Sequence, residues 1–429
     1  MLEYKTPDEY IADVQKHIRW KRAKIVATAE LSDHIDDQYD AFVANGFDES
    51  TAMKKAIQEM GSAETVGREL DGVHRPKIDW ILLALTTILL AIGILVSFLL
   101  LTPAAVFSKA CAIGCGVVVV IVMYFTDYTL LIRYPKLIYG ILTALTLFVS
   151  VWELRNGFYV TGYSYAYYLL LFYPVSLVGI LFQLRYRKSN IPIVQYTLYV
   201  CLPLVLSMLN KSFTAFVLLL VTAIFMLIYS VKLHWFKWDK LNIIGSSSII
   251  VLLSVVVVFS NQLYNIIPDG FYMRQDLFSQ LNLFSALSNS VPIGKSTVLA
   301  DGAMVDYLFD HPISLLLYNC GILPVTILVC VFGILFYLLY RTMKKQNADI
   351  GKLLATMILL IFGVKIICTF VYEMGLLPYF NTGFPFVTTG GVFIIYDMTL
   401  IGIILSISRN ESIAKEWVKL KEKRRIKDE

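Results

Sequence analysis

Long apolar stretches alternate with short polar ones along most of this chain. From Trp80 to Ser408, runs of about 20 residues with few charges recur, and this is the length a helix needs to cross a bilayer. About ten such runs can be marked, so the pattern predicts an all-α, polytopic membrane protein. The predicted spans are 80–101, 106–126, 131–152, 165–184, 192–209, 212–232, 242–260, 312–340, 351–373 and 390–408.

Residues 1–77 have a different pattern, because they are polar and lack the apolar core of a signal peptide. We expect a small helical unit here, with Gly46 and Gly61 ending its second and third helices. Its helices are predicted near 7–20, 22–44, 50–60 and 63–71. The second helix has residues three and four apart that predict one buried face: Leu31, His34, Ile35, Tyr39 and Phe42.

Charge separates the loops into two sets. The chain is 57% apolar and 16% charged, and a soluble domain has nearer 25% charged residues. The net charge of +5 lies largely in short loops beside the spans, which indicates membrane orientation and not nucleic-acid binding. One set of loops contains Arg185, Arg187, Lys188, Lys232, Lys237, Lys240, Arg341, Lys344, Lys345 and Lys352. The tail from Arg409 to Lys427 belongs to this set as well. The other set contains only Lys109, Arg155, Lys211, Arg274 and Lys295. Because Lys and Arg collect on the cytoplasmic side, the first set and both termini are predicted to be cytoplasmic.

All six cysteines lie in or beside predicted spans, so we expect no disulfide framework. Cys111 and Cys115 are four residues apart without a His or acidic partner, which favours packing over a metal site. The basic tail, residues 410–429, is expected either to lie along anionic headgroups or to be solvated.

The longest predicted external segment is 261–311. Leu277, Leu281 and Phe284, near Arg274, have the spacing of an amphipathic helix in the outer interface. The tetrapeptide 294–297, GKST, is the end of a phosphate-binding loop in other proteins. That loop requires glycine where this chain has Asn289, so we exclude it.

The connector between the last two predicted spans has an unusual composition. Residues 375–391, GLLPYFNTGFPFVTTGG, contain two prolines and four glycines, which cannot continue a helix. Non-helical backbone at membrane depth requires protein or a water-filled cavity around it. A bent loop tucked between the spans is therefore predicted, with a plain tight connector as the alternative.

This connector resembles the corresponding segment of the FtsW/RodA/SpoVE (SEDS) family of cell-wall glycan polymerases. The matching residues are Gly375, Leu376, Leu377, Pro378, Pro385, Phe386, Thr388, Gly390 and Gly391, and the match ends at Arg409. Residues 293–309 resemble a second family segment more loosely, with Asp306 at the family's catalytic aspartate. Here the chain has Ala300 in place of a proline and one extra residue before Asp306. An acidic residue that the family carries near the start of the sixth span is missing.

The resemblance implies a SEDS-like membrane domain over 78–409 in a bacterial plasma membrane. Its members polymerise glycan from lipid II, a polyprenyl-pyrophosphate-linked precursor, with a class B penicillin-binding transpeptidase as partner. By this resemblance, Asp306 is the general base, with a helix cap as the alternative. Lys295 and Arg274, or a divalent cation, would face the pyrophosphate, and no other cofactor or protein-held metal is expected. The substrate-binding residues would include Pro385, Phe386, Thr388, Gly390 and Gly391.

The sequence leaves two other functions open. A non-catalytic regulator or scaffold of wall synthesis would explain the missing acidic residue. A flippase or transporter of the lipid-linked precursor would have broken spans in repeated positions, and breaks occur here mainly near the C-terminal end. Residues 1–77 resemble the small helical (HAAS-like) prefix domain found ahead of many bacterial permeases, for which a regulatory or docking role is expected.

Two charges fall inside predicted spans. Lys365 precedes Gly375 by ten residues and Asp397 follows Gly391 by six, which places each about two turns below the external face. Lone charges at that depth are expensive, and the two spans are consecutive and antiparallel, so we predict an ion pair. The family has amide side chains at both places. A link between helices and a role in substrate or proton handling both remain open for this pair.

Overall fold

The computed structural model describes residues 4, 6–76, 78–100, 103–156, 165–185, 191–210, 212–235, 283–296, 312–374, 384–388 and 391–413. Every regular element in these ranges is a helix. The chain divides into two compact units. One consists of Met1–Asp79, Lys345–Ala348 and Ile407–Glu429, and the other of Trp80–Lys344 and Asp349–Ser406.

The first unit contains four helices, close to those predicted: α1 (Pro7–His17), α2 (Lys21–Ala44), α3 (Glu49–Glu59) and α4 (Ala63–His74). Side chains of Thr6, Asp48 and Ser62 accept backbone N–H bonds at the starts of α1, α3 and α4. Gly46 and Gly61 have φ of +89° and +85°, the left-handed conformation that ends α2 and α3.

The core of this unit is formed by small and aliphatic side chains of all four helices, including Val14, Ala27 and Ile35. His34 was predicted to belong to the buried face of α2, and this was wrong, because its side chain is exposed. At about 100° per residue, His34 lies at the margin of the stripe centred on Leu31, Ile35 and Phe42, so a polar ring is solvated there.

Residues after the last long helix complete the same unit. The short helix η2 (Glu411–Ile413) places Ile413 against Val26 in a small buried cluster. Arg22 donates a hydrogen bond of 2.9 Å to the side-chain oxygen of Asn410. The rest of the predicted basic tail, beyond Ile413, lies outside the described residues.

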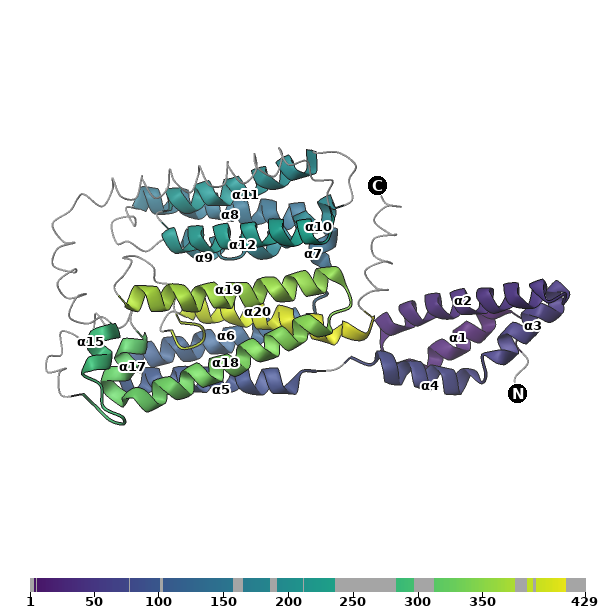
Figure 1. Ribbon diagram of the computed structural model, residues 1–429, viewed down its shortest axis with the longest axis horizontal. Helices are drawn as coiled ribbons and strands as arrows, with labels where there is room; N and C mark the ends of the chain where they lie inside the picture. Colours follow the sequence, from purple (N-terminus) through teal and green to yellow (C-terminus); the bar gives the residue numbers. More distant parts are fainter. Residues whose placement is uncertain are drawn as a thin grey trace. The chain divides into compact units, whose positions relative to one another are not determined.

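The second unit is a bundle of long apolar helices that run side by side (Figure 1). Its helices are α5 (Trp80–Leu100), α6 (Pro103–Phe125), α7 (Leu130–Arg133), α8 (Pro135–Asn156), α9 (Ala166–Leu170), α10 (Tyr173–Leu184), α11 (Ile191–Leu209), α12 (Phe213–Lys232), α15 (Leu283–Ser288), α17 (Pro312–Cys320), α18 (Ile322–Lys345), α19 (Asp349–Glu373) and α20 (Gly391–Arg409). Within the described ranges, eight helical segments are long and apolar enough to cross a membrane, and Val194–Leu209 is a shorter apolar helix. The predicted span 242–260 lies outside the described residues. The protein is an all-α, polytopic membrane protein.

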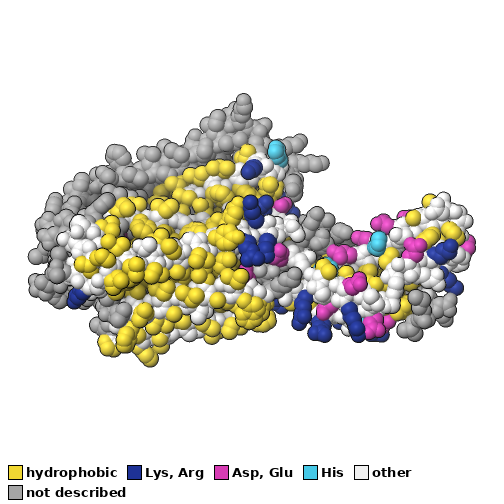
Figure 2. All heavy atoms as spheres, turned by 60° about the horizontal axis from the view of Figure 1, so that its bottom comes forward, with side chains coloured by type: hydrophobic (Ala, Val, Ile, Leu, Met, Phe, Trp, Pro, Cys, Tyr) yellow, Lys and Arg dark blue, Asp and Glu magenta, His cyan; other side chains and the backbone are white. Residues whose placement is uncertain are grey.

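The outer surface of this bundle is apolar, as contact with lipid requires. Phe98, Phe107 and Phe148 each expose about seventy per cent of their surface, at 71%, 72% and 69%. Figure 2 shows apolar side chains over most of the visible face of the bundle, with few charged ones among them. All six cysteines lie in the described ranges, and none of them forms a disulfide.

The predicted span 312–340 is broken into two helices. Gly321, between α17 and α18, has φ of +90°. A Cβ at this position would lie 2.5 Å from the carbonyl oxygen of Val291. Glycine therefore lets the segment 291–296 lie close to the junction of α17 and α18. There the amide of Ile322 donates to the carbonyl of Val291 over 3.0 Å. Hydropathy alone could not locate this break, because both sides of it are apolar.

Candidate functional site

The described part of the predicted bent loop, residues 384–388, is buried between membrane helices. Thr388 donates its amide to the carbonyl of Phe384 over 2.9 Å, and Val387 donates its own to that of Pro385 over 2.7 Å. Phe386 has φ of +62°, a left-handed conformation that costs a non-glycine residue on the order of 1–3 kcal/mol. Surrounding contacts must stabilise this turn, and two charged side chains, Asp397 and Lys109, each supply a hydrogen bond to it.

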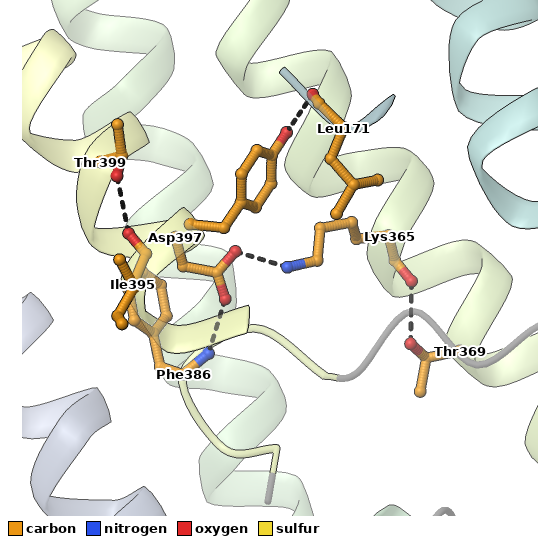
Figure 3. Close-up of polar contacts among 8 residues, drawn as sticks. Leu171, Lys365, Thr369, Phe386, Ile395, Asp397 and Thr399 are labelled. Carbon is orange, nitrogen blue, oxygen red and sulfur yellow. Dashed lines mark hydrogen bonds and ion pairs between the residues drawn. The ribbon is translucent and has the colours of Figure 1, made fainter. Parts of the chain in front are cut away.

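The ion pair predicted between Lys365 and Asp397 is present in the structure (Figure 3). Lys365, on α19, donates from Nζ to Oδ1 of Asp397, on α20. The second carboxylate oxygen, Oδ2, accepts the backbone N–H of Phe386 over 3.1 Å. Both charged side chains are fully buried, with 0% of their surface exposed. Asp397 therefore joins the ion pair to the strained turn.

Aromatic rings enclose this pair. The Lys365 ammonium lies 5.6 Å from the ring centre of Phe393 and 5.3 Å from that of Tyr396. The Tyr396 hydroxyl donates to the carbonyl of Leu171 over 2.9 Å. The ring of Phe386 stacks on that of Phe362 at 5.8 Å. The pair thus lies in an apolar enclosure, where removing one partner leaves an uncompensated charge.

Lys109 is a second buried cation at the loop. We grouped it with the residues of the external loops, although it falls inside the predicted span 106–126. The structure places it within α6 with 1% of its surface exposed, so its assignment to a loop was wrong. Its Nζ donates to the carbonyl of Gly93 (2.7 Å), the hydroxyl of Ser97 (2.9 Å) and the carbonyl of Val387 (2.8 Å). Two of these acceptors are backbone atoms, so the sequence around Lys109 contains no partner that would have indicated its burial.

Glu373 is a buried acid that we did not predict. It is the last residue of α19, and its carboxylate accepts the amides of Ile313 (2.9 Å) and Ser314 (2.7 Å) and the Ser314 hydroxyl (2.8 Å). These groups lie at the start of α17, where backbone N–H groups lack helical partners and favour negative charge. Glu373 thus ties the end of α19, two residues before the motif at Gly375, to the start of α17.

Lys295 has the opposite environment. Its side chain is exposed, on a segment whose backbone is fixed against α17. The amide of Gly294 donates to Cys320 over 3.1 Å, and the amide of Ser296 donates to Tyr318 over 2.7 Å. A cation on a fixed backbone is available to an anionic group outside the protein.

The structure distributes the other predicted site residues unevenly. Pro385, Phe386 and Thr388 are buried, so in this structure they shape the loop. Gly391 begins α20, and a Cβ there would lie 2.9 Å from the Cβ of Ala112. The remaining predicted residues, Asp306, Arg274 and Gly390, lie outside the described residues. Among the residues that the structure does describe, no group of three or more His, Cys, Asp or Glu side chains could hold a metal ion.

Comparisons with known proteins agree with the architecture. The family model FTSW_RODA_SPOVE, described as "Cell cycle protein", matches residues 169–413, more than half of the chain. No curated protein matches the chain.

Solved structures are also similar. A chain from a structure of a peptidoglycan synthase complex, whose title concerns coordination of polymerization and crosslinking, aligns with a TM-score of 0.55 and 15% identity, over 78% of this chain and 98% of that one. A mutant of the rod shape determining protein RodA from Thermus thermophilus aligns with a TM-score of 0.52, 16% identity and the same coverage. The unmutated RodA gives 0.51 and 15%, over 78% of this chain and 97% of that one. At such identities these likenesses concern the fold.

Proposed function

Because this chain belongs to the FtsW/RodA/SpoVE family, we propose that it acts in cell-wall synthesis as a peptidoglycan glycosyltransferase that polymerises lipid II. The observation that carries the proposal is the loop at 384–388. Its residues Pro385, Phe386 and Thr388 match the family motif, and buried Lys109 and Asp397 hold its strained turn inside the bundle. Burying two charged side chains to hold one short loop costs free energy. Buried charges and strained backbone of this kind are typical of functional sites.

The proposed reaction is an inverting glycosyl transfer at the external face. An acceptor sugar hydroxyl attacks the anomeric carbon of the donor, whose leaving group is polyprenyl pyrophosphate. The carboxylate of Asp306 takes the hydroxyl proton as general base. The departing pyrophosphate needs no proton, because cations can balance its charge. Lys295, exposed on its fixed segment, and Arg274 are the cations we assign to this task, or a divalent cation that accompanies the pyrophosphate.

We place the protein in a bacterial plasma membrane with both termini in the cytoplasm. The distribution of Lys and Arg between alternate loops supports this orientation. It puts the connector 375–391 and segment 293–309 on the external face, where lipid II is polymerised. A single-span class B penicillin-binding transpeptidase is the proposed partner, and the similarity in fold to a chain of a peptidoglycan synthase complex supports that choice.

Substitution of the proposed base tests the mechanism. Wild-type protein, purified alone and with candidate transpeptidases, is given labelled lipid II, and glycan products are resolved by size. Asp306→Asn should abolish polymerisation while the variant retains its expression and melting temperature. Asp301→Asn and Asp310→Asn, acids of the same segment, are the matched controls and should polymerise normally. Full activity of Asp306→Asn would refute the assignment.

A non-catalytic regulator of wall synthesis is the second candidate, because the chain lacks an acidic residue that the family carries near Leu209. A regulator would bind the transpeptidase and change its cross-linking rate, yet would leave lipid II unpolymerised under every condition. The same assay, read with a cross-linking measurement, separates the two functions.

A further inference from the structure

Lys109 carries a buried charge that the proposed reaction does not use. Its three N–H bonds are all occupied, by the acceptors of Gly93, Ser97 and Val387. All three acceptors are neutral. Among the described residues, no carboxylate lies close enough to form an ion pair with Lys109. Burying an ammonium without a counter-charge is expensive, so an apolar residue of similar length would serve packing alone better.

The contact with Val387 gives this cation a direct effect on the loop. Val387 follows Phe386, the residue with φ of +62°. From the other side, Asp397 accepts the amide of Phe386 over 3.1 Å. The turn is thus held by α6 through the carbonyl of Val387 and by α20 through the amide of Phe386. Two charge-assisted hydrogen bonds, both in an apolar surrounding, fix the orientation of peptide groups 385–386 and 387–388, which flank the peptide group between Phe386 and Val387.

Gly93, on α5, makes the same turn sterically feasible. A Cβ at this position would lie 2.4 Å from the carbonyl oxygen of Phe386 and 3.2 Å from the Lys109 ammonium. A distance of 2.4 Å is well inside the contact limit, so any larger residue would displace the loop backbone. Gly93 also supplies the carbonyl that Lys109 binds most closely, at 2.7 Å.

We infer that Lys109 and Gly93 act together as positioning residues that hold loop 384–388 in its strained conformation against α5 and α6. The expected effect on polymerisation kinetics rests on the proposed function. The expected effect on the loop conformation rests on the geometry alone. Lys109 is not assigned to pyrophosphate binding, because each of its N–H bonds already has a protein acceptor. An ammonium that bound substrate would have to release one of them.

The experiment compares Lys109→Met and Gly93→Ala with wild type in the full-length protein. Lys136→Met, an exposed lysine at the start of α8, and Gly114→Ala, where nothing lies within 4 Å, are the matched controls. Hydrogen exchange of the amides at 386–388 reports on the loop directly, without substrate. We expect exchange to be about tenfold to a hundredfold faster in both test variants. This factor corresponds to the free energy lost with one hydrogen bond to a charged group. Both controls should exchange like wild type.

Lipid II polymerisation gives the second measurement. A positioning role predicts that Lys109→Met and Gly93→Ala lower kcat about tenfold or more while KM stays within about twofold of wild type. An increase in KM with kcat preserved would overturn the inference in favour of substrate binding by Lys109. Unchanged exchange in both test variants would also overturn it. If Lys109→Met fails to fold, Gly93→Ala against Gly114→Ala decides the question. If wild type lacks polymerase activity, the proposed function fails, and the exchange data alone decide whether the loop is held as inferred.

Discussion

The Lys365–Asp397 pair supports a quantitative prediction, because its replacement by amides can be designed from the structure. Lys365→Gln removes the cation and leaves the Asp397 carboxylate with the Phe386 amide as its other recorded contact. Asp397→Asn removes the anion and leaves a buried ammonium among aromatic rings. Breaking a buried ion pair from either side costs about 3–5 kcal/mol, so each single variant should be strongly destabilised.

The double variant, Lys365→Gln with Asp397→Asn, should recover most of this loss. It leaves no uncompensated charge, and the amide at 397 still offers a carbonyl oxygen to Phe386. The two amides can also bond to each other, because each has a donor and an acceptor. We therefore expect the double variant to lie within about 1.5 kcal/mol of wild type, since replacing a whole buried pair is often nearly neutral.

Thermal unfolding of the purified protein in one detergent measures these differences. At roughly 2–4 °C per kcal/mol, each single variant should lower the Tm by about 6–20 °C. Lys352→Gln, at an exposed position on the same helix as Lys365, controls for the chemistry of the substitution and should leave the Tm unchanged. A double variant at least as unstable as the worse single variant would refute the reasoning, as would a single variant that melts like wild type.

Other contacts give further expectations. Glu373→Gln replaces an acceptor oxygen with an amide group that cannot accept the Ser314 N–H, and should cost about 1–3 kcal/mol, measured by the same melting assay. Asp48 caps α3, and hydrogen bonds from neighbouring Ser and Thr side chains lower the pKa of its carboxyl to about 2. The contribution of this cap to stability should thus be complete above the unfolded pKa of 3.8 and be lost as the pH falls toward 2. A carboxyl NMR titration with its midpoint near 4 would contradict this. Gly321→Ala should lower the Tm, and Gly333→Ala, where nothing lies within 4 Å, should not.

Hydropathy was sufficient to predict most of the membrane helices, because a spanning helix must be apolar over its whole length. The position of the spans also allowed the Lys365–Asp397 pair to be predicted. Two opposite charges at one depth in consecutive spans offset the free-energy cost of their burial most simply by pairing. The prediction rests on side chains alone, and both partners are visible in the sequence.

Contacts between charged side chains and backbone atoms could not be predicted from the sequence. Lys109 binds two carbonyl groups and Glu373 binds two amides, and every residue except proline has both. Nothing in the sequence distinguishes the carbonyl of Val387 from its neighbours. The break at Gly321 was missed for a related reason, because its cause is the approach of Val291 from a distant segment.

Reconstitution tests most directly whether this protein joins lipid II molecules into glycan, as we propose. Purified wild-type protein in liposomes that contain labelled lipid II, with candidate transpeptidases present in turn, should produce glycan chains longer than the substrate. The same liposomes with Asp306→Asn should retain monomeric lipid II. If wild type leaves lipid II monomeric in every combination while an unrelated polymerase consumes it, the protein is not the proposed glycosyltransferase.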